Sequence, residues 1–220
     1  MVFLHGYLSN KESFFYQTEY LSRYFTVFAP DLPGFKENTL PYPFALSDYA
    51  AVVDGFLDEV LKISGQRKVS VVAHSFGARI IFYLSPSDKI DRLVLTGAAG
   101  VKLKKKFGVK CKIAAYKFVK RFFHKSLEGL GSPDYRALSP VMKESFKKII
   151  AYDLTDKIPT VNVPTLIVNG ELDRETPVKS ARIINKKIKG SQLILIKGVG
   201  HFCFIDRPMQ FNLAVKEFLA

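Results

Sequence analysis

The chain has 220 residues, 48% of them hydrophobic, which is enough to bury one substantial core and makes a single domain the default expectation. No apolar run approaches the roughly 18 residues that span a membrane, and residues 1–6 lack the basic start and the apolar length of a secretory signal. The net charge is +13, and the two cysteines, Cys111 and Cys203, fit neither a disulfide framework nor a metal-site spacing. These features predict a cytoplasmic protein with no metal and no cofactor.

Short apolar runs alternate with longer amphipathic segments along most of the chain. The predicted strands are 2–4, 25–29, 69–73, 92–96, 164–169 and 192–196, and the predicted helices are 12–23, 46–63, 76–84, 177–189 and 208–219. Thr176 and Pro177 look like the N-cap and the first residue of one of these helices. Strands that are apolar on both faces are typical of a parallel sheet covered by helices on each side, so the pattern predicts an α/β fold with right-handed crossovers.

Residues 101–152 break this alternation. Apolar residues at helical spacing predict one helix over Phe107, Cys111, Ala114, Phe118 and Phe122, and a second over Val141, Phe146, Ile149 and Ile150. Two helices between strands of one sheet are typical of an inserted cap. We therefore expect a core formed by 1–100 and 153–220 and a helical cap or lid formed by 101–152.

Polar residues follow four of the predicted strands. His5, Gly6 and Tyr7 follow the first, Ser75 follows the third, Asp173 the fifth and His201 the sixth. Ligands of open parallel sheets bind beyond the carboxyl ends of the strands, so these residues are expected at one edge. A serine becomes a nucleophile when a histidine accepts its proton, and a carboxylate holds that histidine in the required tautomer.

The turn around Ser75 has the small residues that a sharp strand-to-helix connection requires. Ala73 and Gly77 lie two residues before and two after the serine, where the strand and helix backbones approach closely. A helix that begins at Phe76 directs its amide donors toward this point. The backbone N–H groups of Phe76 and Tyr7 are therefore the predicted oxyanion hole.

These motifs resemble the α/β-hydrolase superfamily. His5-Gly6 stands in the position of the oxyanion loop, 31–34 reads Asp-Leu-Pro-Gly, and 73–77 resembles the nucleophile elbow, with alanine in place of its usual first glycine. The chain order Ser, Asp, His also matches that of the family. The similarity covers about 1–36, 69–100 and 160–220. The resemblance implies an α/β-hydrolase fold with a cap inserted after the sixth family strand. A serine at position 75 argues against the members that use aspartate there.

The resemblance also implies two further strands before the His5-Gly6 loop, so we expect an N-terminally shortened version of the fold. By the family's strand order, 25–29 would then be an exposed edge strand. An exposed edge can pair with another chain, which makes a homodimer through this strand a hypothesis.

Each candidate has a competing interpretation. Ser75 could simply cap a helix, and Asp173 competes with Glu171, Asp153 and Asp156 for the role of the acid. His5 and His74 are expected to shape the loop and the elbow. Cys203, although close to His201, is expected to be an inert buried thiol.

The positive charge is concentrated in 101–125, which contains ten basic residues and no acidic one: Lys102, Lys104, Lys105, Lys106, Lys110, Lys112, Lys117, Lys120, Arg121 and Lys125. A solvated cap face is the simplest interpretation. A weak contact with an anionic membrane surface is a second hypothesis. Nucleic-acid binding is not expected, because no motif would place this segment in a groove.

Together, the residues predict a serine hydrolase with Ser75 as nucleophile, His201 as base and Asp173 as the acid that orients it. Its substrate would be a small-molecule acyl ester, and a carboxylesterase is the leading interpretation. The alternatives are a C–C bond, thioester or amide hydrolase, an acyltransferase, and a non-catalytic binding module that keeps the fold.

Overall fold

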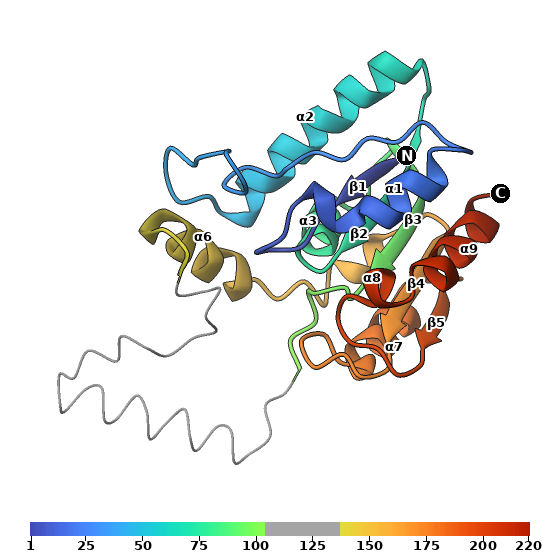
Figure 1. The fold of residues 1–220 in the computed structure, drawn as a ribbon. Helices are drawn as coiled ribbons and strands as arrows, with labels where there is room; N and C mark the ends of the chain where they lie inside the picture. Colours follow the sequence, from blue (N-terminus) through green and yellow to red (C-terminus); the bar gives the residue numbers. More distant parts are fainter. Residues whose placement is uncertain (104–136) are drawn as a thin grey trace, which may run out of the picture.

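The computed structural model describes residues 1–103 and 137–220 (Figure 1). In this part of the chain, five parallel strands form one sheet in the order β1-β2-β3-β4-β5. The strands are β1 (Val2–Leu4), β2 (Val69–His74), β3 (Ile90–Thr96), β4 (Thr165–Gly170) and β5 (Gln192–Ile196). All five therefore have their carboxyl ends at the same edge.

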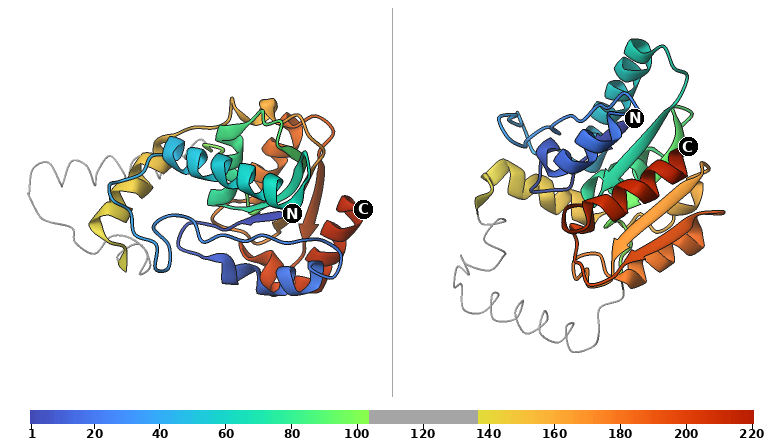
Figure 2. Two further views of the ribbon diagram at one scale, coloured as in Figure 1. Left: turned by 90° about the horizontal axis from the view of Figure 1, so that it is seen from above. Right: turned by 45° about the vertical axis from the view of Figure 1, so that its right-hand side comes forward.

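Helices cover both faces of the sheet. One face carries α2 (Leu46–Ser64), α3 (Phe76–Leu84) and α7 (Val178–Lys187), and the other carries η1 (Lys11–Phe14), α1 (Phe15–Leu21), α8 (Cys203–Asp206) and α9 (Pro208–Leu219). Figure 2 shows α2 and α9 on opposite sides of the strands. This arrangement confirms the predicted α/β fold with a parallel sheet between helices.

The alternation of strand side chains explains the two cores. In β1, Val2 and Leu4 join the cluster beneath α2 and α3, whereas Phe3 joins the cluster beneath α1 and α9. In β2, Val71 joins the cluster beneath α2 and α3, and Val72 joins the cluster beneath α1 and α9. Successive strand residues point to opposite faces, so a strand that is apolar at every position can be buried on both sides.

The predicted strand at 25–29 is wrong as a full strand. Phe28 forms a single parallel bridge with Val2, in which its N–H donates to Met1 O at 2.9 Å and its carbonyl accepts from Phe3 N at 2.8 Å. The segment then reaches Pro30, which has no N–H to continue a ladder. β1 is also only three residues long, so it offers few pairing positions. The homodimer hypothesis that rested on this strand stays untested.

The remaining differences in the helices are local. The predicted helix 12–23 is divided into η1 and α1, and the short helices η2 (Ile158–Thr160) and α8 were not predicted. α7 begins at Val178, with Pro177 at the N-cap, so Thr176 does not have the capping role expected of it.

The second predicted cap helix is present as α6 (Pro140–Ala151), which begins with the Ser139 hydroxyl accepting from Met142 N at 3.3 Å. The predicted helix over residues 107–122, and the basic stretch after residue 103, lie outside the described residues. The division into a core and a cap at 101–152 therefore stays a prediction. Among the described helices, none combines the length and apolarity needed to cross a bilayer.

Candidate active site

The carboxyl edge of the sheet brings together the residues predicted from the sequence. Ser75 follows β2, Asp173 lies three residues beyond the end of β4, and His201 follows β5. His201 Nδ1 lies 2.8 Å from Asp173 Oδ2, and both side chains are buried. Ser75 lines a cavity together with Thr176 and Phe202, the neighbours of this pair. No hydrogen bond joins Ser75 to His201 in the described structure.

Ser75 occupies a strained backbone conformation between β2 and α3. Its φ is 48° and its ψ is −99°, a region that residues with a Cβ rarely adopt. The turn packs tightly against β1, because a Cβ on Gly77 would lie 2.5 Å from the carbonyl oxygen of Leu4. Only glycine fits two residues after the serine. Ser75 thereby lies at the turn before α3, where it lines the cavity of this edge.

Asp173 is held by four hydrogen bonds. Its Oδ1 accepts from the N–H groups of Glu175 and Thr176, both at 2.9 Å, and its Oδ2 accepts from Thr176 Oγ1 at 2.7 Å and from His201 Nδ1 at 2.8 Å. Burial alone would raise the pKa of Asp173, but the hydrogen bonds from His201 and Thr176 outweigh it and hold the pKa below its ordinary value. An ionised carboxylate can only accept, so His201 carries its proton on Nδ1 and leaves Nε2 as the basic nitrogen.

His201 reaches this position because the loop after β3 leaves space for its ring. Gly97 has a φ of +50°, and a Cβ there would lie 2.9 Å from the imidazole. On the other side, Nε2 lies 3.4 Å from Glu175 Oε2, a carboxylate whose side chain is 68% exposed. Glu175 therefore marks the open end of the site.

The two residues predicted to supply the oxyanion donors contact each other through their rings and line one cavity. Phe76 is the first residue of α3, so its N–H has no acceptor within the helix. The Tyr7 and Phe76 rings are 5.3 Å apart, and both residues line the cavity that contains Ser75. The Tyr7 hydroxyl donates to Met142 O of α6 at 2.7 Å, which fixes the loop after β1 against this helix.

The cavity at this edge has a volume of about 540 Å³. Most of the wall that the described residues form is apolar, and its charged side chains in this part of the chain are Arg79 and Glu175. The lining residues are Tyr7, Leu8, Ser75, Phe76, Arg79, Ala99, Phe146, Ile149, Ile150, Glu175, Thr176 and Phe202. A pocket of this size and polarity suits a small substrate with an apolar acyl group.

The two other histidines of this edge have structural surroundings. His5 Nε2 accepts from Leu32 N at 2.9 Å and its Nδ1 lies 2.8 Å from Gly6 O, so the ring is neutral and ties the first loop to the next. His74 is buried against His201, with ring centroids 4.7 Å apart, and its nitrogens have no hydrogen-bond partner among the described residues. Burial lowers the pKa of both His5 and His74, that of His74 by more.

The competing candidates lie in other environments. Glu171 accepts from Gly198 N at 3.4 Å and does not contact His201, while Asp153 accepts from Thr155. Burial raises the pKa of Cys203 to about 11, so this thiol is not a ready nucleophile. Of the carboxylates that were candidates for the acid, Asp173 is the one that contacts the His201 Nδ1.

Three residues of the site were missed from the sequence. Thr176 was assigned to a helix cap, but its hydroxyl binds Asp173 and lies 3.2 Å from His201 Nδ1. Glu175 and Arg79 belong to none of the motifs recognised in the sequence. The available signal for Arg79 was a lone charge within the apolar run of α3.

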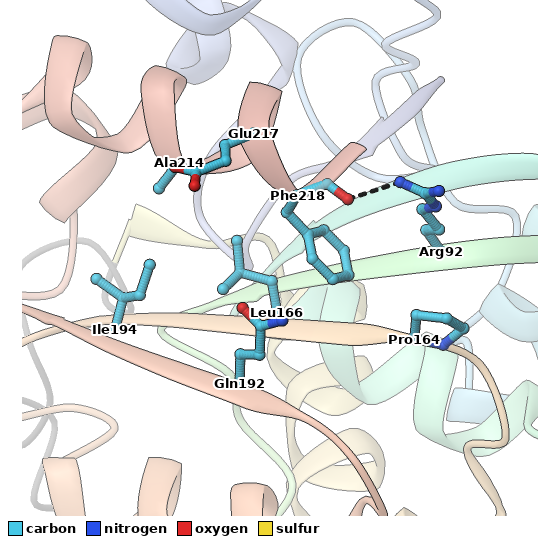
Figure 3. A pocket seen from close by; sticks show the side chains of 8 residues that line it. All are labelled: Arg92, Pro164, Leu166, Gln192, Ile194, Ala214, Glu217 and Phe218. Atoms are coloured by element: carbon cyan, nitrogen blue, oxygen red, sulfur yellow. Dashed lines mark hydrogen bonds between the residues drawn. The ribbon is translucent and has the colours of Figure 1, made fainter. Parts of the chain in front are cut away.

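A second hollow of about 490 Å³ lies at the opposite, amino ends of β3, β4 and β5. Figure 3 shows its wall, where a guanidinium nitrogen of Arg92 donates to Phe218 O of α9 at 2.7 Å. The other lining residues are Pro164, Leu166, Gln192, Ile194, Ala214 and Glu217. None of them is a serine, cysteine or histidine, so this wall offers no nucleophile–base pair.

Comparison with known proteins finds relatives that match nearly the whole chain. The model of the Alpha/beta hydrolase family matches residues 1–214. The chain is 28% identical over 225 residues to 2-hydroxy-6-oxo-2,4-heptadienoate hydrolase of Pseudomonas putida, covering 91% of the chain and 80% of the relative. It is 25% identical over 253 residues to pimeloyl-[acyl-carrier protein] methyl ester esterase of Wigglesworthia glossinidia brevipalpis, covering 100% and 93%.

Solved structures share the fold. The meta-cleavage product hydrolase of Pseudomonas fluorescens superimposes with a TM-score of 0.74 at 22% identity, over 99% of this chain and 89% of the other. The similarity extends across the whole sheet and its helices, so the arrangement of the strand ends is that of an established architecture.

Proposed function

Because the chain belongs to the alpha/beta hydrolase family, we propose that it is a serine hydrolase that cleaves an ester-like acyl substrate through Ser75, His201 and Asp173. The observation that carries the proposal is the buried 2.8 Å contact between His201 Nδ1 and Asp173 Oδ2 beside a serine with a strained backbone. A structural serine at a helix start needs neither feature. Their combination is the arrangement that activates a hydroxyl.

In the proposed reaction, Ser75 Oγ attacks the carbonyl carbon while its proton passes to His201 Nε2. Asp173 stabilises the imidazolium through Nδ1–H, and the N–H groups of Phe76 and Tyr7 bind the oxyanion. His201 then gives its proton to the leaving alcohol as the acyl–oxygen bond breaks. Water, deprotonated by the same Nε2, attacks the acyl-enzyme and releases the acid, which restores Ser75.

A carboxylesterase for small or medium acyl esters is the best-supported specificity. The apolar wall formed by Phe76, Phe146 and Ile149 suits an acyl chain, and the Wigglesworthia relative is named as a methyl ester esterase. The name of the Pseudomonas putida relative denotes a keto acid. A hydrolase acting on such a ketone through the same three residues is therefore the second candidate.

The first experiment is intact-mass spectrometry after treatment with a fluorophosphonate. We expect one adduct on the wild type and none on Ser75→Ala, because an activated serine alone reacts readily. Ser87→Ala, a serine outside the cavity, is the matched control and should label like the wild type. A folded wild type that forms no adduct would overturn the proposal and favour a non-catalytic module.

A further inference from the structure

Arg79 lies on α3, four residues after Ser75, and lines the same cavity. Its side chain is almost fully buried, since the residue is 9% exposed. Nη2 donates to the carbonyl oxygens of Ile149 at 2.6 Å and Tyr152 at 2.7 Å, at the end of α6. Nη1 makes no hydrogen bond to any described residue, and Nε is buried without an acceptor there.

The charge of Arg79 has no carboxylate in direct contact, although Asp153 acts on it at longer range and favours its charged form. Burial lowers the pKa of Arg79, yet a guanidinium keeps its proton in proteins. The side chain forms no ion pair with an Asp or Glu in the described structure, and the two carbonyls carry only partial charge. Lys89 shows the contrast: it is more exposed, and it pairs with both Asp54 and Asp58. A buried charge is expected to be paired.

The position of Arg79 assigns it to one half of the cavity. The leaving group must reach His201 Nε2, which lies on the side of Glu175, near the open mouth. Arg79 contacts the end of α6 through the carbonyls of Ile149 and Tyr152, and the residues of α6 that line the cavity are Phe146, Ile149 and Ile150. Arg79 lies in the first turns of α3, and long side chains lean toward the N-terminus of their helix, where Ser75 lies. An acyl chain that extends from Ser75 toward α6 would therefore bring its far end to the guanidinium.

We propose that Arg79 is a specificity-determining residue that binds a carboxylate at the far end of the acyl group, so that the substrates are half-esters of short dicarboxylic acids. This inference rests on the proposed function. The free N–H groups of Nη1 would donate to the carboxylate, while Nη2 keeps its bonds to α6. The negative Glu175 disfavours the reverse orientation, with the carboxylate at the mouth.

The test compares substrates that differ only in this terminal group. Monoethyl succinate, glutarate and adipate are each paired with the ethyl ester of the corresponding monoamide, and ethanol release gives kcat/KM. For at least one chain length we expect the wild type to prefer the carboxylate by about tenfold or more, the value of one or two hydrogen bonds to a charged group. The preference should weaken at high salt.

Variants connect the preference to Arg79. Arg79→Gln should lower kcat/KM for the carboxylate substrates more than for their amides, so that the preference is lost, and Arg79→Lys should keep part of it. Arg92→Gln is the matched control, because Arg92 also donates to a helix carbonyl but lines the other hollow; its preference should equal that of the wild type. Circular dichroism establishes that each variant is folded, and the wild-type substrate pairs need no variant at all.

The outcomes separate the two proposals. If Ser75 forms the fluorophosphonate adduct but no half-ester is preferred over its amide, the carboxylate site is wrong and the serine hydrolase stands. The carboxylate site is also wrong if Arg79→Gln keeps the full preference. If Ser75 forms no adduct and no ester is cleaved, the proposed function fails and the inference fails with it.

Discussion

Two hollows of similar volume, about 540 and about 490 Å³, lie at opposite ends of the same parallel strands. At the carboxyl ends, the loops after β2, β4 and β5 bring Ser75, Asp173 and His201 to one edge, and the loop after β3 contributes Ala99 to the cavity wall. At the amino ends, the wall consists of side chains that α9 and the strands already use for packing. The volume of the two hollows therefore does not distinguish them. The difference lies in the loops that follow the carboxyl ends of the strands.

Each hollow also contains an arginine that donates to helix carbonyls, and the two differ in what surrounds them. Arg92 forms its bond beside the acidic Glu217, in a hollow at the surface. Arg79 is nearly fully buried, forms no ion pair among the described residues, and lines the same cavity as the strained Ser75. The same residue type is thus structural at one end and, in our proposal, a substrate ligand at the other.

The largest expected effect at the carboxyl edge after loss of Ser75 itself comes from Asp173→Asn. The amide retains the size of the side chain, but its NH₂ group cannot hold His201 in the Nδ1–H tautomer. We expect kcat to fall by about 10³- to 10⁴-fold, measured on the best ester of the substrate series.

The matched control is Glu171→Gln, which changes the other acidic residue of the same loop. Glu171 contacts Gly198 rather than His201, so its variant should keep activity within a few-fold of the wild type. Equal losses in the two variants would show that Asp173 acts only through the structure of the loop.

The packing of the elbow gives the next effect. Gly77→Ala places a Cβ 2.5 Å from Leu4 O, a backbone atom that cannot move aside, so we expect about 1–3 kcal/mol of destabilisation. Gly55→Ala, within α2, meets no atom within 4 Å and should stabilise the fold by about 0.5–1 kcal/mol. Urea unfolding measures the free energy of unfolding of both variants. The comparison fails if the two substitutions change this free energy in the same direction.

The residues of the candidate site could be found in the sequence because their signals are local. Five consecutive residues are enough to recognise the small-residue turn around Ser75, and His201 is found directly from its place after the last strand. The parallel sheet then brings both residues to one edge. What was missed depends on distant or ambiguous contacts. Arg79 contacts Ile149, which is 70 residues away in the chain. A threonine before a proline has the sequence pattern of an N-cap, whether its hydroxyl caps a helix or binds Asp173.

The failed strand at 25–29 has a related cause. Its composition is that of a strand, but pairing depends on the partner, and β1 has three residues. The same limit explains why local propensity identified β2 to β5, each of which is five to seven residues long and paired with its neighbours.

The last expected effect is a pH dependence of stability that arises at the carboxyl edge. His5 and His74 have pKa values below 6.5 in the folded protein, mainly through burial, whereas the unfolded chain binds a proton on each near that pH. The unfolded state therefore holds more protons below about pH 6.5. The free energy of unfolding should fall as the pH decreases, by up to about 1.4 kcal/mol per pH unit for each histidine.

His74→Phe isolates one of these contributions. The phenyl ring can keep the contacts with His201, Phe202 and Phe204, but it cannot bind a proton. Urea unfolding between pH 7 and pH 5 gives the free energy of unfolding as a function of pH. The slope of this dependence should be shallower for the variant, by an amount that corresponds to up to one bound proton. An unchanged slope would mean that His74 is protonated in the folded state as readily as in the unfolded chain. Its ring would then have to charge beside His201, where burial and the neighbouring imidazole both oppose a positive charge.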